Sequence, residues 1–173
     1  MKILQTIFLL SILLASCAQN TDEKTINTDQ SKQEIAAMLD SFNLAAAHAD
    51  YDSYFNFYTD DATYIGTDAT EHWDKKAFMV WAKPFFDRKR AWNFKKIQRN
   101  IYFGQHNDIA WFDELLDTQM KICRGSGVVV RQNNQWKIQQ YVLSMTVPNA
   151  KTDSVVKIKA VIEDILIQQL KDR

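Results

Sequence analysis

The chain has 173 residues, of which 46% are hydrophobic and 24% are charged, and its formal net charge at pH 7 is zero. This length and composition supply one well-packed domain and not two. The basic residues are dispersed, so the sequence lacks the electrostatic footprint of a nucleic-acid-binding protein, and we expect no nucleic-acid partner.

The start of the chain has the pattern of a targeting segment. Lys2 precedes an almost wholly apolar run, residues 7–15, which is too short to span a bilayer as a stable helix. The run ends in the sequence LASC, residues 14–17, which matches the lipobox of bacterial lipoprotein signal peptides. Residues 1–16 are therefore predicted to be a signal peptide, and Cys17 is predicted to be the lipidated N-terminus of the mature chain.

Acyl chains on Cys17, palmitate among them, would attach the protein stably to a membrane. The resemblance to lipoproteins implies a bacterial cell-envelope location, and Ala18 in place of Asp after the cysteine indicates the outer membrane. The polar stretch of residues 17–30 is predicted to be a flexible tether. With Cys17 acylated, Cys123 has no partner within the chain, so no disulfide is expected.

Helices are predicted in the first half of the folded part. The sequence SKQE, residues 31–34, is a capping box, and apolar residues follow it at helical spacing until about Asp50. A second, shorter helix is predicted within residues 50–62, followed by a short strand. Asp74 is expected to cap a third helix, which Pro84 should kink or end in its last turns.

From residue 92 onward the hydrophobic pattern changes to a period of two, which is typical of strands. Strands are expected near residues 92–103, 108–118, 120–132 and 135–145. The side chains of Asn133 and Asn134 tolerate the positive φ of a two-residue hairpin. Strands so close in sequence must pair antiparallel. A final helix is predicted from Asp153 to about Lys171.

This order of elements predicts an α+β domain in which helices cover one face of an antiparallel sheet. A curved sheet wrapped around the N-terminal helices leaves a cone, and a cone that side chains do not fill is a pocket. The predicted organisation is a signal peptide at 1–16, a tether at 17–30, one domain at 31–150 and an extra C-terminal helix at 151–173.

Several short motifs resemble the SnoaL-like branch of the nuclear transport factor 2-like superfamily. They include Asp60-Asp61-Ala62, Gly66-Thr67-Asp68, the sequence AWFDE at 110–114 and the sequence RGSGV at 124–128. The resemblance covers residues 31–150 and implies a cone-shaped fold. In ketosteroid isomerase-like relatives, acids on the inner wall of the cone transfer protons or donate hydrogen bonds.

Related domains often carry histidines on the final strand, at positions that match Gln140 and Val142 here. This chain therefore lacks an imidazole there that could act as a base or a metal ligand. Its histidines, His48, His72 and His106, are scattered through the sequence and are predicted to be solvated. We therefore expect neither a metal site nor a cofactor.

Asp113 and Glu114 are the candidate catalytic residues. Neighbouring strand residues point to opposite faces, so one acid should face the interior and the other the outside. We favour Asp113 as the interior acid because Trp111 and Leu115 share its face. Phe112, Leu116 and Val129 would then lie on the outer face, and Trp136, Ile138 and Val142 would form the apolar face of the last strand. The alternative is a structural ion pair, in which Arg124 on the next strand neutralises either acid.

The candidate ligand-binding residues are Tyr64, Trp73, Trp111, Arg124 and Tyr141. The two tyrosines would offer hydroxyls to a ligand or simply fill space, and Trp73, Trp81 and Trp111 would form an aromatic wall or belong to the core. Asp68 and Glu71 would cap the following helix or close the mouth of the cone.

Two functions remain open from the sequence. The first is an envelope lipoprotein that binds a small apolar molecule in its cavity, or that acts as a scaffold by pairing its outer sheet face in a homodimer. The second is a small-molecule isomerase, cyclase or dehydratase that uses Asp113 or Glu114 as acid or base. The sequence contains no nucleophile motif and no metal set, which favours binding.

Overall fold

The computed structural model describes residues 28–172. The predicted signal peptide, the predicted lipidation site Cys17 and most of the predicted tether lie outside these residues. Within residues 28–172, no helix has both the length and the apolar character needed to cross a bilayer. The elements in chain order are α1 (Thr28–Ala47), α2 (Tyr51–Asn56), β1 (Tyr58–Ile65), β2 (His72–Asp74), α3 (Lys75–Asp87), β3 (Lys95–Phe103), β4 (Ile109–Thr118), β5 (Lys121–Gln132), β6 (Gln135–Met145), the 3-10 turn η1 (Asn149–Lys151) and α4 (Thr152–Lys171).

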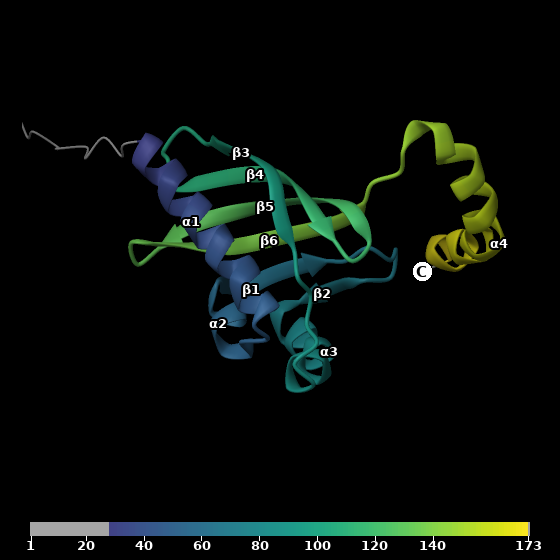
Figure 1. Ribbon diagram of the computed structural model, residues 1–173, viewed down its shortest axis with the longest axis horizontal. Helices are drawn as coiled ribbons and strands as arrows, with labels where there is room; N and C mark the ends of the chain where they lie inside the picture. The colour runs from purple at the N-terminus through teal and green to yellow at the C-terminus, as the bar shows by residue number, and fades with distance from the viewer. Residues whose placement is uncertain (1–27, 173) are drawn as a thin grey trace, which may run out of the picture.

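The predicted α+β fold is confirmed: the strands form one curved six-stranded sheet in the order β2-β1-β6-β5-β4-β3 (Figure 1). Strands β3 to β6 pair antiparallel as a meander, as their spacing in the sequence predicts. Strand β1 pairs parallel to β6, which makes the sheet mixed. A parallel pair needs a long connection, and the whole of α3 and the meander supply it.

Helix α1 lies across one face of the sheet and provides much of the core (Figure 1). Its buried side chains, Ile35, Leu39, Phe42 and Ala46, recur at helical spacing. The helix begins at Thr28, inside the predicted tether, and ends at Ala47. The predicted capping-box start is therefore wrong, because Ser31 lies within the helix and is buried.

The two shorter helices begin with aspartate caps, and their aromatic side chains extend the core. The side chain of Asp74 accepts a hydrogen bond from the backbone N–H of Ala77 at 2.8 Å, which confirms the predicted cap of α3. Asp50 caps α2 in the same way through Ser53. Pro84 lies in the last turn of α3, which ends at Asp87.

The hairpin and the bulge of β6 decide which side chains face the core. Asn133 and Asn134 adopt φ values of 50° and 62°, which confirms the predicted two-residue turn. The pairing of β5 with β6 then shifts between Val128 and Val129, because β6 contains a bulge. Before the bulge Trp136 and Ile138 face inward, and after it Tyr141 and Leu143 do so. The expectation that Val142 shares the inner face is therefore wrong, because one extra residue reverses the alternation.

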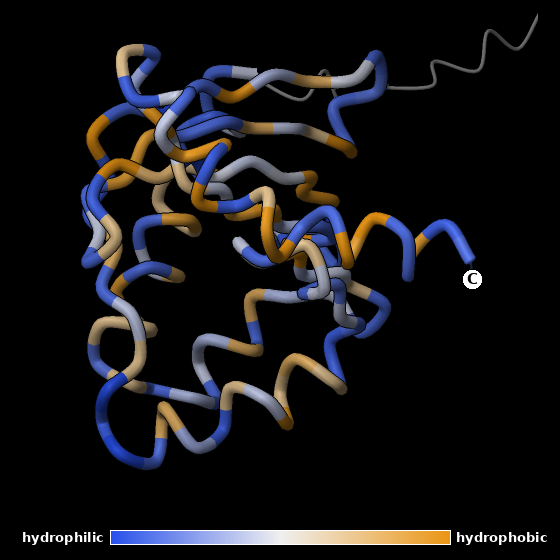
Figure 2. The backbone as a smooth tube through the Cα atoms, turned by 90° about the vertical axis from the view of Figure 1, so that its right-hand side faces the viewer, coloured by the Kyte–Doolittle hydropathy of each residue, from blue (hydrophilic) through white to orange (hydrophobic). Residues whose placement is uncertain are grey.

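Helix α4 stands apart from the sheet and buries none of its residues (Figure 1). Figure 2 shows hydrophobic and hydrophilic positions alternating along the trace that leads to the C-terminus. Large aliphatic side chains, Ile158, Val161, Ile162 and Ile165, are each more than half exposed there.

Candidate functional site

The two adjacent acids of β4 face opposite sides of the sheet, but in the reverse of the expected sense. Glu114 is 1% exposed and shares the inner face with Phe112 and Leu116, whereas Asp113 is half-buried on the outer face. Phe112, Leu116 and Val129 are core residues and not outer-face residues. The expectation is wrong because it rests on Trp111, which is 47% exposed and stacks on Tyr102 outside the core.

Arg99, directly opposite Glu114 on β3, is the partner of the buried carboxylate. Its Nε donates to Glu114 Oε2 at 2.8 Å, and its Nη2 forms an ion pair with the same oxygen at 2.7 Å. Its Nη1 donates to the Ala36 carbonyl at 2.9 Å and to Asp40 Oδ1 at 2.8 Å, both on α1. The sequence alternative expected Arg124 to pair with one of the two acids. Arg124 pairs with Asp113, whereas Arg99 forms the ion pair of the buried Glu114.

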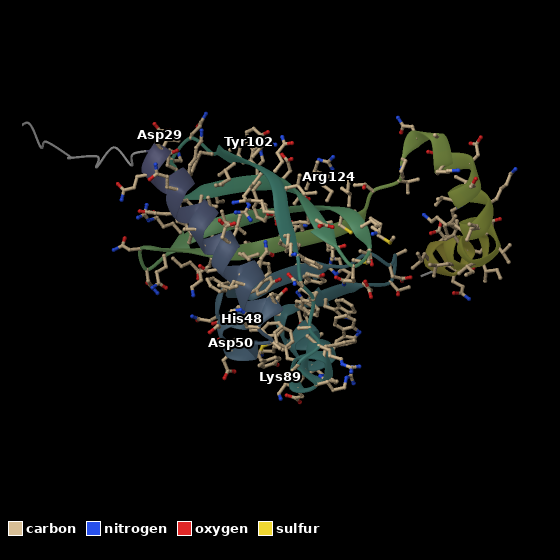
Figure 3. All side chains as sticks on the ribbon, in the orientation of Figure 1. Asp29, His48, Asp50, Lys89, Tyr102 and Arg124 are labelled. Carbon is tan, nitrogen blue, oxygen red and sulfur yellow. The ribbon has the colours of Figure 1, made fainter. Side chains whose placement is uncertain are left out.

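Arg124 lies on the exposed side of the sheet together with Asp113. Its Nη1 is 3.7 Å from Asp113 Oδ1, and both side chains are partly solvated. Figure 3 shows Arg124 and Tyr102 on the side of the sheet away from α2 and α3. An ion pair this long and this exposed contributes little to stability.

Tyr141 completes the buried group around Glu114. Its hydroxyl donates to Glu114 Oε1 at 3.0 Å, so both carboxylate oxygens are engaged. Burial raises the pKa of Tyr141 far above its usual value, and the charge of Glu114 raises it further. Gly125 makes this contact feasible, because a Cβ at that position would lie 2.4 Å from the Tyr141 hydroxyl.

A cavity of about 580 Å³ lies beside this buried group, between the β1–β2 loop, α3, the segment that follows α3, and the β4–β5 turn. Its lining is mainly aromatic and aliphatic, with a few polar residues: Tyr64, Thr67, Glu71, Trp81, Phe85, Arg90, Ala91, Trp92, Asn93, Phe94, Gln119, Met120 and Leu143. Of the predicted ligand-binding residues, Tyr64 lines this cavity.

The other four predicted ligand-binding residues do not line it. Trp73 stacks on Trp81, a lining residue, with ring centroids 4.8 Å apart. Tyr141 is buried behind Tyr64, with parallel rings 6.0 Å apart. Trp111 and Arg124 lie on the outer face of the sheet. Of the predicted aromatic wall, Trp81 lines the cavity, Trp73 packs behind it and Trp111 lies elsewhere.

The end of α3 turns the chain so that residues 90–94 form one wall of the cavity. Lys89 adopts a left-handed conformation with φ 55°, and its N–H donates to the Phe86 carbonyl at 2.9 Å. The N–H of Arg90 donates to the Phe85 carbonyl at 3.0 Å, which completes a helix-ending Schellman pattern. The sequence does not indicate Arg90 and Trp92 as cavity residues, because Lys89 stands where a glycine would mark this turn.

Tyr64 and Glu71 are two of the polar residues among the aromatic and aliphatic side chains of the cavity wall. Tyr64 is 8% exposed, packs face to face on Phe78 at 3.9 Å, and its hydroxyl has no hydrogen-bond partner within residues 28–172. Burial raises the pKa of Tyr64, and the nearby charge of Glu71 raises it further. Glu71 itself is half-buried at the mouth, as one of the two sequence alternatives proposed.

The described part of the chain offers no group of three or more metal-ligating side chains. The three histidines are all exposed and far apart in the sequence. Cys123, also within these residues, is a buried free thiol.

The comparisons with known proteins agree with this architecture. The SnoaL-like domain profile matches residues 35–148. No curated protein matches the chain significantly. Among solved structures, a nuclear transport factor 2-like protein of unknown function from Pseudomonas putida KT2440 has a TM-score of 0.59 at 16% identity, over 70% of this chain and 90% of that one.

Two further structures share the fold. A candidate dehydratase of the nuclear transport factor 2-like family from Streptomyces avermitilis has a TM-score of 0.61 at 10% identity, over 70% of this chain and 99% of that one. A candidate scytalone dehydratase from Novosphingobium aromaticivorans has a TM-score of 0.59 at 12% identity, over 69% and 87% of the two chains. At these identities the likeness concerns the fold alone. Since the domain profile covers most of the sequence, the chain belongs to the SnoaL-like domain family.

Proposed function

We propose that the protein is an envelope lipoprotein whose SnoaL-like domain binds a small apolar molecule in the aromatic cavity. The observation that carries this proposal is the cavity itself. Its volume of about 580 Å³ falls in the range of small-molecule sites, and its walls are mainly aromatic and aliphatic. An aromatic and aliphatic wall binds a ligand mainly because binding removes the apolar surfaces of both the ligand and the wall from water.

The buried charges favour binding over acid–base chemistry. Glu114 is nearly inaccessible, and its two oxygens are occupied by Arg99 and by the Tyr141 hydroxyl. A general base must reach the proton that it abstracts, either directly or through one water. Asp113 faces the outside of the sheet, away from the cavity lining.

The alternative is an isomerase, cyclase or dehydratase that uses Asp113 or Glu114 as acid or base. One contact favours Glu114 in such a role: its partner Tyr141 stacks parallel to Tyr64, whose ring lines the cavity. The structural neighbours that are candidate dehydratases are consistent with this alternative through their fold. It would require Glu114 to exchange one of its present partners for a substrate.

Probe binding tests the proposed site. A neutral hydrophobic fluorophore, N-phenyl-1-naphthylamine, should bind residues 28–172 with enhanced fluorescence. Trp81→Ala should weaken this binding about tenfold, because it removes aromatic surface from the cavity wall. Trp111→Ala is the matched control, since Trp111 is similarly exposed on the outer face, and it should leave binding unchanged. Equal effects of the two substitutions would contradict the site.

The natural ligand and any turnover are tested together. Mass spectrometry of small molecules released from the purified native protein should recover one apolar compound that the Trp81→Ala variant retains less well. Re-incubation of that compound with fresh protein should return it unaltered. A mass change that Glu114→Gln abolishes would instead support the enzyme.

The lipid anchor has its own test. Cys17→Ala in the full chain should move the protein out of the detergent-soluble membrane fraction, because the acylated side chain is lost. A variant that remains in that fraction as before would contradict the lipoprotein proposal.

A further inference from the structure

Among the polar residues that line the cavity, Tyr64 and Glu71 offer a hydroxyl and a carboxylate to which a purely apolar ligand could not hydrogen-bond. The side chain of Tyr64 is more than nine-tenths buried and lines the cavity. Its hydroxyl has no hydrogen-bond partner within residues 28–172. Within residues 28–172 this hydroxyl is not one of the fully buried side-chain atoms that lack a partner, so it opens onto the cavity, where water or a ligand can bond it. A ligand that displaces such a water without replacing its hydrogen bond loses affinity. A ligand that supplies the missing bond would therefore bind more tightly than one that does not.

The second group is the carboxylate of Glu71, which the β1–β2 loop holds in place. The backbone N–H of Asp68 donates to Glu71 Oε2 at 3.2 Å, and the N–H of Gly66 donates to the Glu71 carbonyl at 2.9 Å. Gly66 leaves the space that the carboxylate occupies, because a Cβ there would lie 2.1 Å from Glu71 Oε2. These contacts of the β1–β2 loop therefore hold the Glu71 carboxylate at the cavity.

Glu71 keeps its charge free for a ligand. Within residues 28–172, no cation forms an ion pair with it, although Arg90 lines the same cavity. Arg90 is exposed at the mouth, where solvent screens its charge, whereas Glu71 is half-buried. The charge of Glu71 also raises the pKa of Tyr64, and both residues line the same cavity.

We propose that this cavity selects ring compounds whose head group donates a hydrogen bond, a hydroxyl or an ammonium, and that it rejects carboxylates. This inference rests on the proposed binding function and adds the class of ligand. A hydroxyl accepts from the Tyr64 phenol and donates to Glu71, so it satisfies both groups. An ammonium donates to both groups and pairs with the charge of Glu71, and the surrounding rings favour a cation. A carboxylate lacks a donor and meets the like charge of Glu71.

A matched naphthalene series tests the inference by displacement of N-phenyl-1-naphthylamine from residues 28–172. The probes are 1-naphthalenemethanol, 1-naphthylmethylamine, 1-methylnaphthalene and 1-naphthoate. We expect the alcohol and the amine to displace the fluorophore at concentrations about tenfold lower than the carboxylate, with the methyl compound between them.

Two substitutions assign the discrimination to these residues. Glu71→Gln should bring the carboxylate to within about twofold of the methyl compound and should weaken the amine, while Glu163→Gln on α4 should leave the ranking unchanged. Tyr64→Phe should remove the advantage of the alcohol and serves as the second variant if Glu71→Gln does not fold. Equal affinities across the series, with fluorophore binding intact, overturn the ligand class but leave the binding function standing. Loss of fluorophore binding by the unaltered domain overturns the binding function itself.

Discussion

The buried ion pair of Glu114 and Arg99 links β3, β4 and α1 through side-chain hydrogen bonds. Glu114 belongs to β4 and Arg99 to β3, and Arg99 also bonds the Ala36 carbonyl and Asp40 of α1. Lys96 pairs with Asp40 on the solvent side at 3.0 Å. Desolvation raises the pKa of Asp40, but the hydrogen bonds from Lys96 and Arg99 outweigh it and lower that pKa overall. The group therefore fixes the position of α1 on the sheet.

We expect Glu114→Gln to destabilise the fold by on the order of 3 kcal/mol, because it leaves the buried Arg99 guanidinium with only the half-exposed Asp40 as a compensating charge. Asp113→Asn is the matched control on the neighbouring residue, and it should change stability by less than about 1 kcal/mol, since its pair with Arg124 is exposed. Urea unfolding followed by tryptophan fluorescence measures both. A harmless Glu114→Gln would show that the buried pair contributes nothing to the fold.

Buried tyrosines predict a loss of stability at high pH. Burial raises the pKa of four of them above the ordinary value: Tyr54, Tyr58, Tyr64 and Tyr141. Above pH ~10 the unfolded chain releases these protons while the folded chain keeps them. Their stabilising effect is thus complete below pH ~10 and is lost as the pH rises further.

Each of these tyrosines should lower the free energy of unfolding by about 1.4 kcal/mol per pH unit in that range. Urea unfolding between pH ~9 and ~11 measures the slope, and Tyr141→Phe should make it shallower. Tyrosinate absorbance of the native protein is the independent check. Ionisation of all six tyrosines before unfolding begins would contradict the buried assignment.

Alternation within β4 correctly predicted one interior acid, but the residue-level pairing could not be read from the sequence. The choice between Asp113 and Glu114 depends on the register with β3, which places Arg99 opposite Glu114. One signal was present: Arg99 alternates with Ile101 and Phe103, which pack against the core. An arginine at such a position indicates a buried acid nearby, because an unpaired charge would not remain there.

At the scale of elements, the end of α3 shapes the cavity through a residue in an unfavourable conformation. Lys89 has φ 55°, a left-handed conformation that costs an L-residue about 1 kcal/mol relative to glycine. Its side chain is exposed, so the conformation is set by the helix-ending hydrogen bonds and not by packing.

We expect Lys89→Gly to raise the free energy of unfolding by about 0.5 to 1 kcal/mol, because glycine adopts the left-handed conformation without strain. Lys76→Gly is the matched control within the same helix, and it should lower stability by up to about 1 kcal/mol. The cavity wall should be retained, so fluorophore binding should not change in Lys89→Gly. A destabilising Lys89→Gly would show that the lysine side chain itself holds the turn.

Periodicity and turn chemistry predicted the helices, the meander and the Asn133-Asn134 hairpin, because these depend on local residues. The bulge of β6 and the parallel pairing of β1 depend on contacts between distant segments and were missed. The bulge matters for the site, since it turns Tyr141 and Leu143 inward. Without it Val142 would occupy the inner face and Glu114 would lose the Tyr141 hydroxyl.

At the scale of the whole molecule, two apolar surfaces have no cover within residues 28–172. The outer sheet face exposes Tyr102, Ile109, Trp111 and Ile122 by 45% to 49% each. Helix α4 exposes aliphatic side chains along most of its length and buries no residue. Large apolar side chains exposed together on one surface are a mark of association sites.

We predict that residues 28–172 form a homodimer in which the outer sheet faces pair. Most soluble oligomers are symmetric, and a two-fold pair buries the same patch on both copies. Sedimentation equilibrium should give twice the monomer mass. Trp111→Glu should shift the molecules to monomer, because the charge would be desolvated in the interface. Leu44→Glu, on the exposed side of α1 and 55% exposed, is the control and should leave the dimer intact.

Removal of residues 149–172 separates the sheet face from α4 as the source of association. Because α4 buries nothing, the shortened chain should unfold at the same urea concentration as the longer one. If the sheet faces form the dimer, the shortened chain should also remain dimeric and Trp111→Glu should still dissociate it. A shortened chain that sediments as a monomer would assign the interface to α4, and a monomer before any change would refute the dimer altogether.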